Sequence, residues 1–291
     1  MERKPNWLKI KLEAGEGYAR VKRIVEHNNL HTICSSGRCP NIGKCWNMGT
    51  ATFMILGDIC TRSCKFCATK TGKPMPPDTD EIQKVAESIS VMQLKHCVIT
   101  SVDRDDLQDK GAAFWAEVIR TVRSRNPHTL IEVLTPDFDN VDEHLNKVFD
   151  AEPDIFAHNI ETVERLSAQI RSRARYKLSL DVLRKSAERG IITKSGLMAG
   201  LGETQAEVEA CLQDIRNVGC KMITIGQYLQ PSKSNIPVAA YITPEQFEAY
   251  RQYCLQIGFE SVESAPLVRS SFMAERSFIS SNIGFALCRD R

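Results

Sequence analysis

Short apolar runs alternate with amphipathic stretches along the chain from residue 51 onward. The runs are rich in Val, Ile and Leu and lack strict alternation of apolar and polar positions. This pattern is typical of strands that are buried on both faces of a parallel sheet. Six runs predict strands, at Thr52–Gly57, Cys97–Val102, Leu130–Leu134, Asp154–Ala157, Ile192–Met198 and Met222–Ile225.

Helix-period stretches lie between these runs, for example over residues 82–89 and 208–218. Gly219 follows the second stretch, where glycine commonly ends a helix. Thr243 and Pro244 open a last helix as its N-cap and first helical residue. Strand spacings of roughly 25 to 45 residues suit βαβ units and predict a parallel α/β fold. The pattern alone leaves a partial barrel and an open sheet as alternatives.

Three segments are expected from this pattern. Residues 1–50 form an irregular N-terminal extension, residues 51–258 the α/β domain, and residues 259–291 a C-terminal tail. The composition is 42% hydrophobic and 25% charged with a net charge of +2, which excludes a disordered chain. Dispersed Lys and Arg predict no nucleic-acid partner, and no apolar run reaches the roughly 20 residues of a membrane span. Residues 1–14 resemble no targeting signal, so a cytoplasmic protein with reduced thiols is expected.

Six of the 11 cysteines lie between Cys34 and Cys67, in two groups of three. The second group has the spacing C-x3-C-x2-C, directly after the first predicted strand, where parallel α/β folds place their chemistry. Three thiolates can bind three irons of a [4Fe–4S] cluster and leave the fourth iron open for a ligand. Zinc would require a fourth ligand, usually from a second C-x2-C, and no such motif is present.

The first group has the spacing C-x4-C-x5-C from Cys34 to Cys45. Two glycines and a proline within it predict a loop that wraps a second cluster with its backbone N–H groups turned inward. A binuclear zinc site that uses all six cysteines is the alternative, but the spacings fit none of the common paired frames.

Polar clusters follow four of the predicted strands. Because the carboxyl ends of parallel strands share one edge, these clusters predict the rim of a pocket. The alternative is that each cluster caps a helix, through Asp105, Thr162 or Thr204, which accounts for one residue per loop. The clusters are Thr100–Asp106, His158–Thr162, Gly200–Thr204 and Gln227–Pro231.

The C-x3-C-x2-C motif is the signature of radical S-adenosylmethionine (SAM) enzymes, and together with the upstream motif it resembles the lipoyl synthase family. Two departures from the family pattern are Phe272, where Tyr is usual, and Lys110, where Gly is usual. Further matching segments are Thr100–Leu107, Pro136–Phe138, His158–Val163, Thr193–Met198, Gly200–Thr204, Thr224–Leu229 and Pro266–Ser271.

The resemblance implies a partial (β/α)6 TIM-type barrel with a cysteine-rich N-terminal extension and a short C-terminal tail. It implies two [4Fe–4S] clusters and SAM as cofactors. The reducing cluster, whose open iron binds SAM, would be held by Cys60, Cys64 and Cys67. The auxiliary cluster would be held by Cys34, Cys39, Cys45 and a serine, for which Ser271 is preferred over Ser270.

The implied activity is sulfur insertion at C6 and C8 of a protein-bound octanoyl-lysine. One electron cleaves SAM to a 5′-deoxyadenosyl radical, which abstracts hydrogen from the octanoyl chain, and the carbon radical then takes sulfur from the auxiliary cluster. The chemistry resides on the clusters, so no side chain is predicted to be catalytic. Predicted SAM contacts are Phe66, Thr100, Ser101, Asp103, Asn159, Glu161, Gly200 and Gly202.

Implied partners are octanoylated lipoyl-domain proteins, namely acyltransferase subunits of 2-oxoacid dehydrogenases and the glycine cleavage H protein. An electron donor such as flavodoxin or ferredoxin and an iron–sulfur carrier are also implied. The alternatives are another radical SAM enzyme with an auxiliary cluster, such as a methylthiotransferase, and a non-enzymatic metal-cluster protein. About eight irons per chain would support the two-cluster enzyme, whereas zinc without iron would exclude it.

Overall fold

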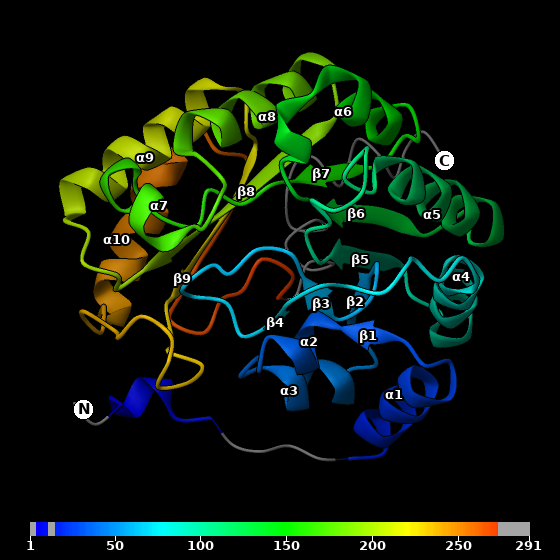
Figure 1. Cartoon of the computed structure of the whole chain (residues 1–291). Coiled ribbons are helices and arrows are strands. Elements are labelled where there is room, and N and C mark those ends of the chain that lie inside the picture. The colour runs from blue at the N-terminus through cyan, green and yellow to red at the C-terminus, as the bar shows by residue number, and fades with distance from the viewer. Residues whose placement is uncertain (1–3, 11–14, 273–291) are drawn as a thin grey trace. The chain divides into compact units, whose positions relative to one another are not determined.

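The computed structural model describes residues 4–10 and 15–272, which Figure 1 draws in colour. Internal contacts divide the chain into two compact units. The N-terminal unit comprises residues 12–63 and 67–157, and the C-terminal unit comprises residues 1–11, 64–66 and 158–291. Residues 273–291, most of the predicted tail, lie outside the described residues. Among the described helices, none is long and apolar enough to cross a membrane.

The N-terminal unit is built on four parallel strands that pair in chain order. The helices α4 (Asp80–Met92), α5 (Ala112–Arg125) and α6 (Asp142–Phe149) follow three of them, and α5 packs between the other two (Figure 1). Each strand agrees with its prediction to within two residues at either end, because buried apolar runs are the strongest strand signal. The strands are β2 (Thr52–Ile55), β5 (His96–Ser101), β6 (Leu130–Leu134) and β7 (Ile155–Ala157).

The predicted irregular extension is wrong, because residues 16–47 form helices and a short strand. The helix α1 (Glu16–His27) buries Val21 and Val25 and packs on α3 (Ile42–Asn47). Its Tyr18 ring lies 5.1 Å from that of Trp46, measured between centroids. The strand β1 (His31–Thr32) pairs antiparallel with β2, and α2 (Ile33–Ser36) follows it. The helices α2 and α3 are too short to carry a readable period.

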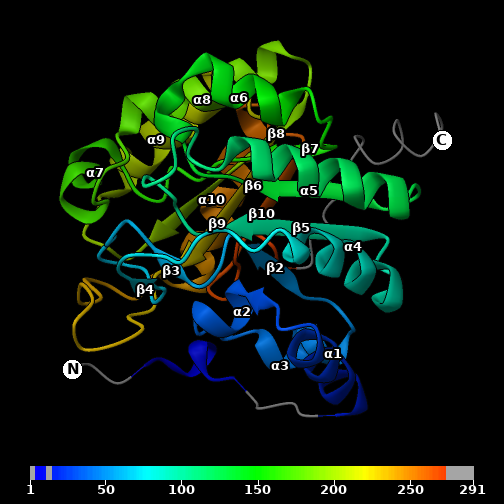
Figure 2. The ribbon, with the colours of Figure 1, turned by 45° about the vertical axis from the view of Figure 1, so that its right-hand side comes forward.

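The C-terminal unit has three parallel strands, β8 (Ile192–Ala199), β9 (Met222–Gln227) and β10 (Ser261–Ser264). The first two confirm predicted strands, whereas β10 lies in the segment expected to be a tail. Its half-polar sequence carries no strand signal, and its pairing with β9 makes it a strand. The unit's helices, visible in Figure 2, are α7 (Glu164–Ile170), α8 (Tyr176–Glu188), α9 (Gln205–Asn217) and α10 (Pro244–Gln256).

Predicted helix ends in the C-terminal unit are confirmed. The Thr204 hydroxyl accepts a hydrogen bond from the Glu207 backbone N–H, and the Glu207 carboxylate accepts one from the Thr204 N–H. The Thr243 hydroxyl likewise accepts from the Gln246 N–H at the start of α10. Gly219 follows α9 with φ +92°, a left-handed conformation that glycine adopts without steric cost.

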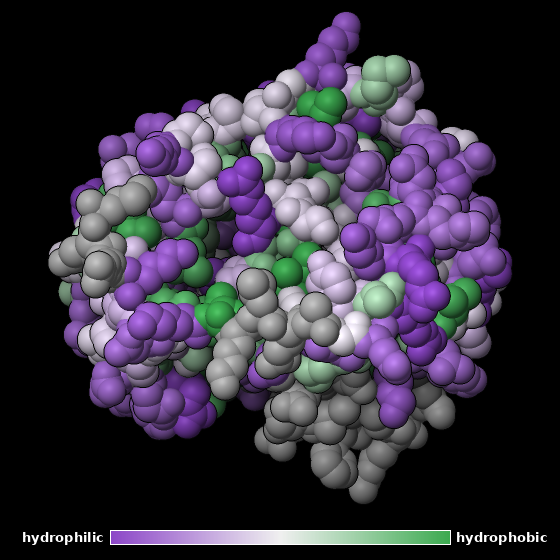
Figure 3. All heavy atoms as spheres, turned by 90° about the horizontal axis from the view of Figure 1, so that it is seen from below, coloured by the Kyte–Doolittle hydropathy of each residue, from purple (hydrophilic) through white to green (hydrophobic). Residues whose placement is uncertain are grey.

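The surface carries few large exposed hydrophobic side chains among the described residues. Figure 3 shows a face on which hydrophilic residues predominate and hydrophobic residues stand in small groups. Isolated exposed apolar residues are normal for a folded protein. They are Trp7, Ile10, Met48, Met75, Val91, Val141 and Leu255.

Candidate iron–sulfur and SAM site

The first cysteine group lies in the N-terminal unit, with Cys34 on α2, Cys45 on α3 and Cys39 in the turn between them. Cys34 is buried, whereas Cys39 and Cys45 are half-buried. Burial and, after it, the nearby Cys34 and Cys39 raise the pKa of the Cys45 thiol to about 12. The three sulfurs are therefore close enough to repel one another as thiolates, which is the arrangement that a shared cationic cluster would relieve.

Backbone N–H groups in this segment bond to backbone carbonyls. The N–H groups of Cys39 and Cys45 donate to the carbonyls of Cys34 and Asn41, at 2.9 Å each. The predicted loop is confined to residues 37–41 between the two helices, and the N–H groups of Cys39 and Cys45 bond to carbonyls instead of turning toward a cluster. Burial also raises the pKa of Cys34, and hydrogen bonding to Thr52 opposes that rise.

The second cysteine group is supported differently. Cys60 ends the short strand β3 (Ile59–Cys60), which pairs with β4 (Lys70–Thr71). The backbone N–H groups of Arg62 and Asp103 donate to the Cys60 sulfur, at 3.4 and 3.3 Å. The Thr69 N–H donates to the Cys67 sulfur at 3.4 Å. Such bonds stabilise thiolates that ligate iron and tune the cluster they hold.

Cys64, in the C-terminal unit, has its sulfur 3.5 Å from the Ser172 hydroxyl oxygen. Burial raises the pKa of the Cys60 thiol to about 12, and the Asp103 carboxylate adds to that rise. With this raised pKa the free Cys60 thiol stays protonated. Ligation of a metal cation would remove that proton. Both donor sets suit iron–sulfur ligation on these grounds. In the part of the chain that is described, no three His, Cys, Asp or Glu side chains are arranged to hold a single metal ion.

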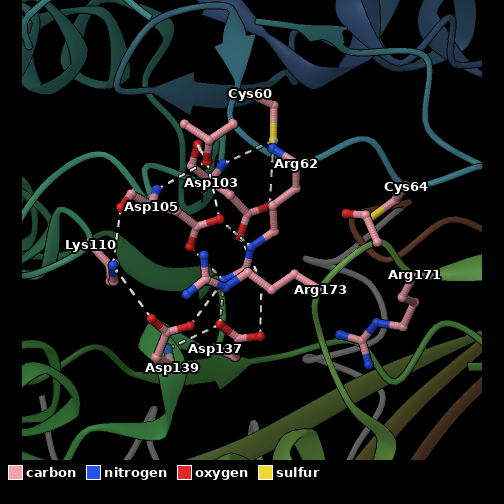
Figure 4. A network of polar contacts seen from close by, with 12 residues as sticks. Cys60, Arg62, Cys64, Asp103, Asp105, Lys110, Asp137, Asp139, Arg171 and Arg173 are labelled. Carbon is pink, nitrogen blue, oxygen red and sulfur yellow. Dashed lines mark hydrogen bonds and ion pairs between the residues drawn. The ribbon is translucent and has the colours of Figure 1, made fainter. Parts of the chain in front are cut away.

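Arg62 lies between two cysteines of the second group, and its side chain is only 5% exposed. Its guanidinium makes two hydrogen bonds to each of two carboxylates, Asp105 at 2.9 Å and Asp137 at 2.8 and 2.9 Å. Asp103 and Asp139 lie 3.3 and 3.7 Å away, so four carboxylates surround one cation (Figure 4). Sequence analysis missed this network, because its members are up to 77 residues apart and an isolated Arg carries no signal.

Lys110, one of the two departures from the family pattern, belongs to the same network. Its ammonium group lies 3.4 Å from the Asp139 carboxylate and donates to the Asp105 carbonyl at 3.1 Å. Its φ of +57° is left-handed, which is the conformation that favours the usual glycine at this position. Here a second cation joins the four carboxylates at the expense of backbone strain.

Three predicted SAM contacts lie at the end of β5. The Thr100 hydroxyl donates to the Leu134 carbonyl at 2.9 Å, and the Ser101 hydroxyl accepts from the Trp115 indole at 3.3 Å. Asp103 lies beside Cys60, as described above. Asp105 was expected as a possible helix cap, and this is wrong: Gly111 is the N-cap of α5, and Asp105 binds Arg62.

The predicted contacts Asn159 and Glu161 lie together in the C-terminal unit. The Asn159 amide donates to the Glu161 carboxylate at 3.1 Å and to the Ser270 hydroxyl at 2.7 Å. Burial raises the pKa of Glu161, and Arg171 and Asn159 oppose that rise. Thr162 is buried and does not cap a helix, because Val163 is the N-cap of α7.

Gly200, Gly202 and Phe66 also lie in the C-terminal unit. Gly200 has φ +99°, and a Cβ there would lie 2.2 Å from the Gln227 amide nitrogen and 2.4 Å from the Ala240 carbonyl oxygen. The absence of a side chain at Gly200 thus lets Gln227 and Ala240 of the same chain approach its backbone closely. Phe66 packs, partly buried, against the hydrophobic core of the unit. The roles of these residues toward SAM stay predictions.

Comparison with known families identifies the class first. Residues 54–215 match the Radical SAM superfamily, which is more than half of the chain, so this is a radical SAM protein. Relatives called lipoyl synthase include that of Bacteroides fragilis, 62% identical over 94% of this chain and 95% of the relative. That of Parabacteroides distasonis is 58% identical over 94% and 98%. The chain therefore belongs to the lipoyl synthase family, whose members use SAM and iron–sulfur chemistry.

Solved structures share the fold at low sequence identity. Methylornithine synthase (PylB) superimposes with a TM-score of 0.57 at 13% identity, over 86% of this chain and 72% of that one. Streptococcus suis SuiB bound to S-adenosylmethionine gives 0.56 at 7% identity, over 83% and 52%. These likenesses concern the fold alone and, with the paired strands above, confirm the α/β class with mostly parallel strands.

Proposed function

We propose that this chain is the enzyme that inserts sulfur at C6 and C8 of a protein-bound octanoyl-lysine to form the lipoyl group. Family membership supports this reaction. The observation that carries it in the structure is the presence of two separate three-cysteine groups with different surroundings. A single-cluster enzyme would have no use for the first group, whereas a sulfur donor requires a second cluster.

The proposal assigns a SAM-binding cluster to Cys60, Cys64 and Cys67, the group next to β3 and β4. When bound, this cluster supplies the electron that cleaves SAM. The chain supports it through the N–H groups of Arg62 and Asp103, which donate to the Cys60 sulfur. Thr100, Ser101, Asp103, Asn159, Glu161, Gly200, Gly202 and Phe66 remain the proposed contacts for SAM itself.

The auxiliary cluster, the proposed sulfur donor, is assigned to Cys34, Cys39, Cys45 and Ser271. Ser271 is proposed from the family pattern, and the neighbouring Ser270 hydroxyl accepts a hydrogen bond from the Asn159 amide at 2.7 Å. A hydroxyl oxygen is a harder ligand than a thiolate, so its bond to iron is the one expected to open when sulfur leaves.

The proposed substrates are octanoylated lipoyl-domain proteins, such as 2-oxoacid dehydrogenase acyltransferase subunits and the glycine cleavage H protein. Flavodoxin or ferredoxin would supply electrons, and an iron–sulfur carrier would rebuild the auxiliary cluster. The cytoplasmic location stays a prediction.

Anaerobic turnover with SAM, a reductant and an octanoyl-lysine peptide tests the reaction. Mass spectrometry is expected to find two sulfur atoms added to the peptide, together with 5′-deoxyadenosine. Formation of 5′-deoxyadenosine without sulfur in the peptide would refute lipoyl formation but keep the radical SAM class. Metal analysis is expected to give about eight irons per chain, the content of two [4Fe–4S] clusters.

A further inference from the structure

Arg62 ties the cysteine loop to the two segments that follow β5 and β6. Its own backbone belongs to the cysteine loop, and its N–H donates to the Cys60 sulfur at 3.4 Å. Its guanidinium grips Asp105 and Asp137, which follow β5 and β6. Figure 4 shows the side chain running from the cysteine loop into the group of carboxylates. The other N–H on the Cys60 sulfur comes from Asp103, in the segment that Asp105 continues.

Thr61 adds a second link between the cysteine loop and the segment that carries Asp103 and Asp105. Its backbone N–H and its hydroxyl both donate to the Asp103 carbonyl, at 3.0 and 2.9 Å. Its hydroxyl oxygen accepts from the Asp105 N–H at 3.0 Å. These contacts align the two segments, and the two hydrogen bonds from the Arg62 guanidinium to Asp105 join them again.

The turn that carries Asp137 is strained. Phe138, Asp139 and Asn140 all have left-handed backbones, with φ of +46°, +54° and +59°. Residues other than glycine rarely adopt this conformation, and such backbone strain persists only where surrounding contacts hold it. The paired hydrogen bonds from Arg62 to Asp137, at 2.8 and 2.9 Å, are contacts of that kind. The left-handed turn therefore places the carboxylates of Asp137 and Asp139 next to Arg62, and the bonds from Arg62 hold the turn in this conformation.

We propose that Arg62 is a positioning residue that fixes two backbone N–H groups on the Cys60 sulfur and so sets the reduction potential of the SAM-binding cluster. This rests on the proposed function, in which Cys60 ligates that cluster. Hydrogen bonds to cluster sulfurs favour the more negative, reduced state. This positioning requires the planar guanidinium of Arg62, which binds two carboxylates at once. The ammonium group of a lysine is a point charge and cannot make these paired hydrogen bonds.

The test is a redox titration of the whole iron-loaded protein, in which electron paramagnetic resonance measures the reduced cluster at each potential. The signal that changes when SAM is added identifies the SAM-binding cluster. In Arg62→Gln, the ratio of reduced to oxidised cluster at a fixed potential is expected to fall about tenfold, which for one electron corresponds to about 59 mV. Arg62→Lys keeps the charge but loses the fork and is expected to shift nearly as far.

Asp105→Asn provides a milder variant in case Arg62→Gln loses its iron, and a fall of about threefold in the same ratio is expected. Arg123→Gln is the matched control. It breaks an Arg–Asp pair with Asp154, at 2.6 Å, beside the opposite ends of the strands. It is expected to lower stability and leave the potential unchanged.

Wild-type potential in both Arg62→Lys and Asp105→Asn would overturn the positioning role. An equal shift in Arg123→Gln would also overturn it, because the effect would then follow from general destabilisation. A wild-type protein without any SAM-sensitive signal would remove the proposed function and this inference together, so the two failures can be told apart.

Discussion

The two cysteine groups have the same number of thiols but different supports. In the group at Cys60, backbone N–H groups point at the sulfurs of Cys60 and Cys67. In the group at Cys34, the N–H groups of Cys39 and Cys45 donate to backbone carbonyls, and Thr52 hydrogen-bonds to the sulfur of Cys34. An equal ligand count therefore does not imply an equal site. The contrast suits the proposed roles, since one cluster is kept through the reaction and the other gives up its sulfur.

Charge separates the two groups as well. The loop of Cys60 is anchored through Arg62 to four carboxylates, with Lys110 as a second cation. Near Cys45, the other two thiols of its group raise its pKa and Lys44 lowers it. The group at Cys34 should therefore depend more on bound iron for its order than the group at Cys60 does.

The largest expected difference comes from removing one cysteine of each group. Cys64→Ala should abolish both 5′-deoxyadenosine formation and sulfur insertion, because the SAM-binding iron is lost. Cys39→Ala should abolish sulfur insertion but retain 5′-deoxyadenosine formation. Chromatography of the nucleoside and mass spectrometry of an octanoyl-lysine peptide measure the two outcomes. Loss of both activities in both variants would contradict separate roles.

Serine variants give the next largest difference. Ser271→Ala should reduce sulfur insertion at least about a hundredfold, because even the loss of a residue that only supports a metal ligand costs 10–100-fold. Ser270→Ala loses one hydrogen bond from Asn159 and should cost about fivefold, equivalent to ~1 kcal/mol. Iron retention after desalting should follow the same order. Equal losses in the two variants would remove the distinction between these serines.

Trp46→Phe tests the side-chain support of the first group. The variant keeps an aromatic side chain but loses the second ring of a buried indole that packs against Tyr18. Loss of this packing, of order ~1 kcal/mol, should make the auxiliary cluster release its iron to a chelator about fivefold faster. The SAM-sensitive resonance signal should decay at the wild-type rate. Faster loss of both signals would show a general effect on stability.

The smallest effect is expected for Lys110→Gly. Glycine relieves the left-handed strain, worth about 1 kcal/mol, and loses an ion pair to Asp139 worth about 0–1 kcal/mol. The free energy of unfolding of the apoprotein, measured in urea, should therefore change by less than about 1 kcal/mol. A loss above about 2 kcal/mol would show that Lys110 is an essential counter-charge in the Arg62 network.

Sequence reasoning succeeded where one local rule decides the structure. The six strands follow from buried apolar runs, and the Thr204 and Thr243 caps from short-range hydrogen bonds. It failed where partners far apart in sequence decide. The half-polar strand β10 exists through its pairing with β9, and the helices α2 and α3 are single turns or little more.

The same limit applies to the candidate site. The cysteine spacing could be read directly, because ligand number and loop position are local properties of the chain. Arg62 could not be assigned, since its partners Asp105 and Asp137 lie 43 and 75 residues further along. For Asp105 the local alternative was a helix cap, and this alternative is wrong because the distant Arg62 binds its carboxylate.

The central claim is that the two cysteine groups hold clusters with different fates. It is tested most directly by a single turnover of protein whose clusters were built with ³⁴S-sulfide, using an octanoyl-lysine peptide and no added sulfur source. The account predicts a lipoyl peptide with two ³⁴S atoms and retention of the SAM-sensitive resonance signal. A product with unlabelled sulfur, or loss of the SAM-sensitive cluster instead of the other, would contradict it.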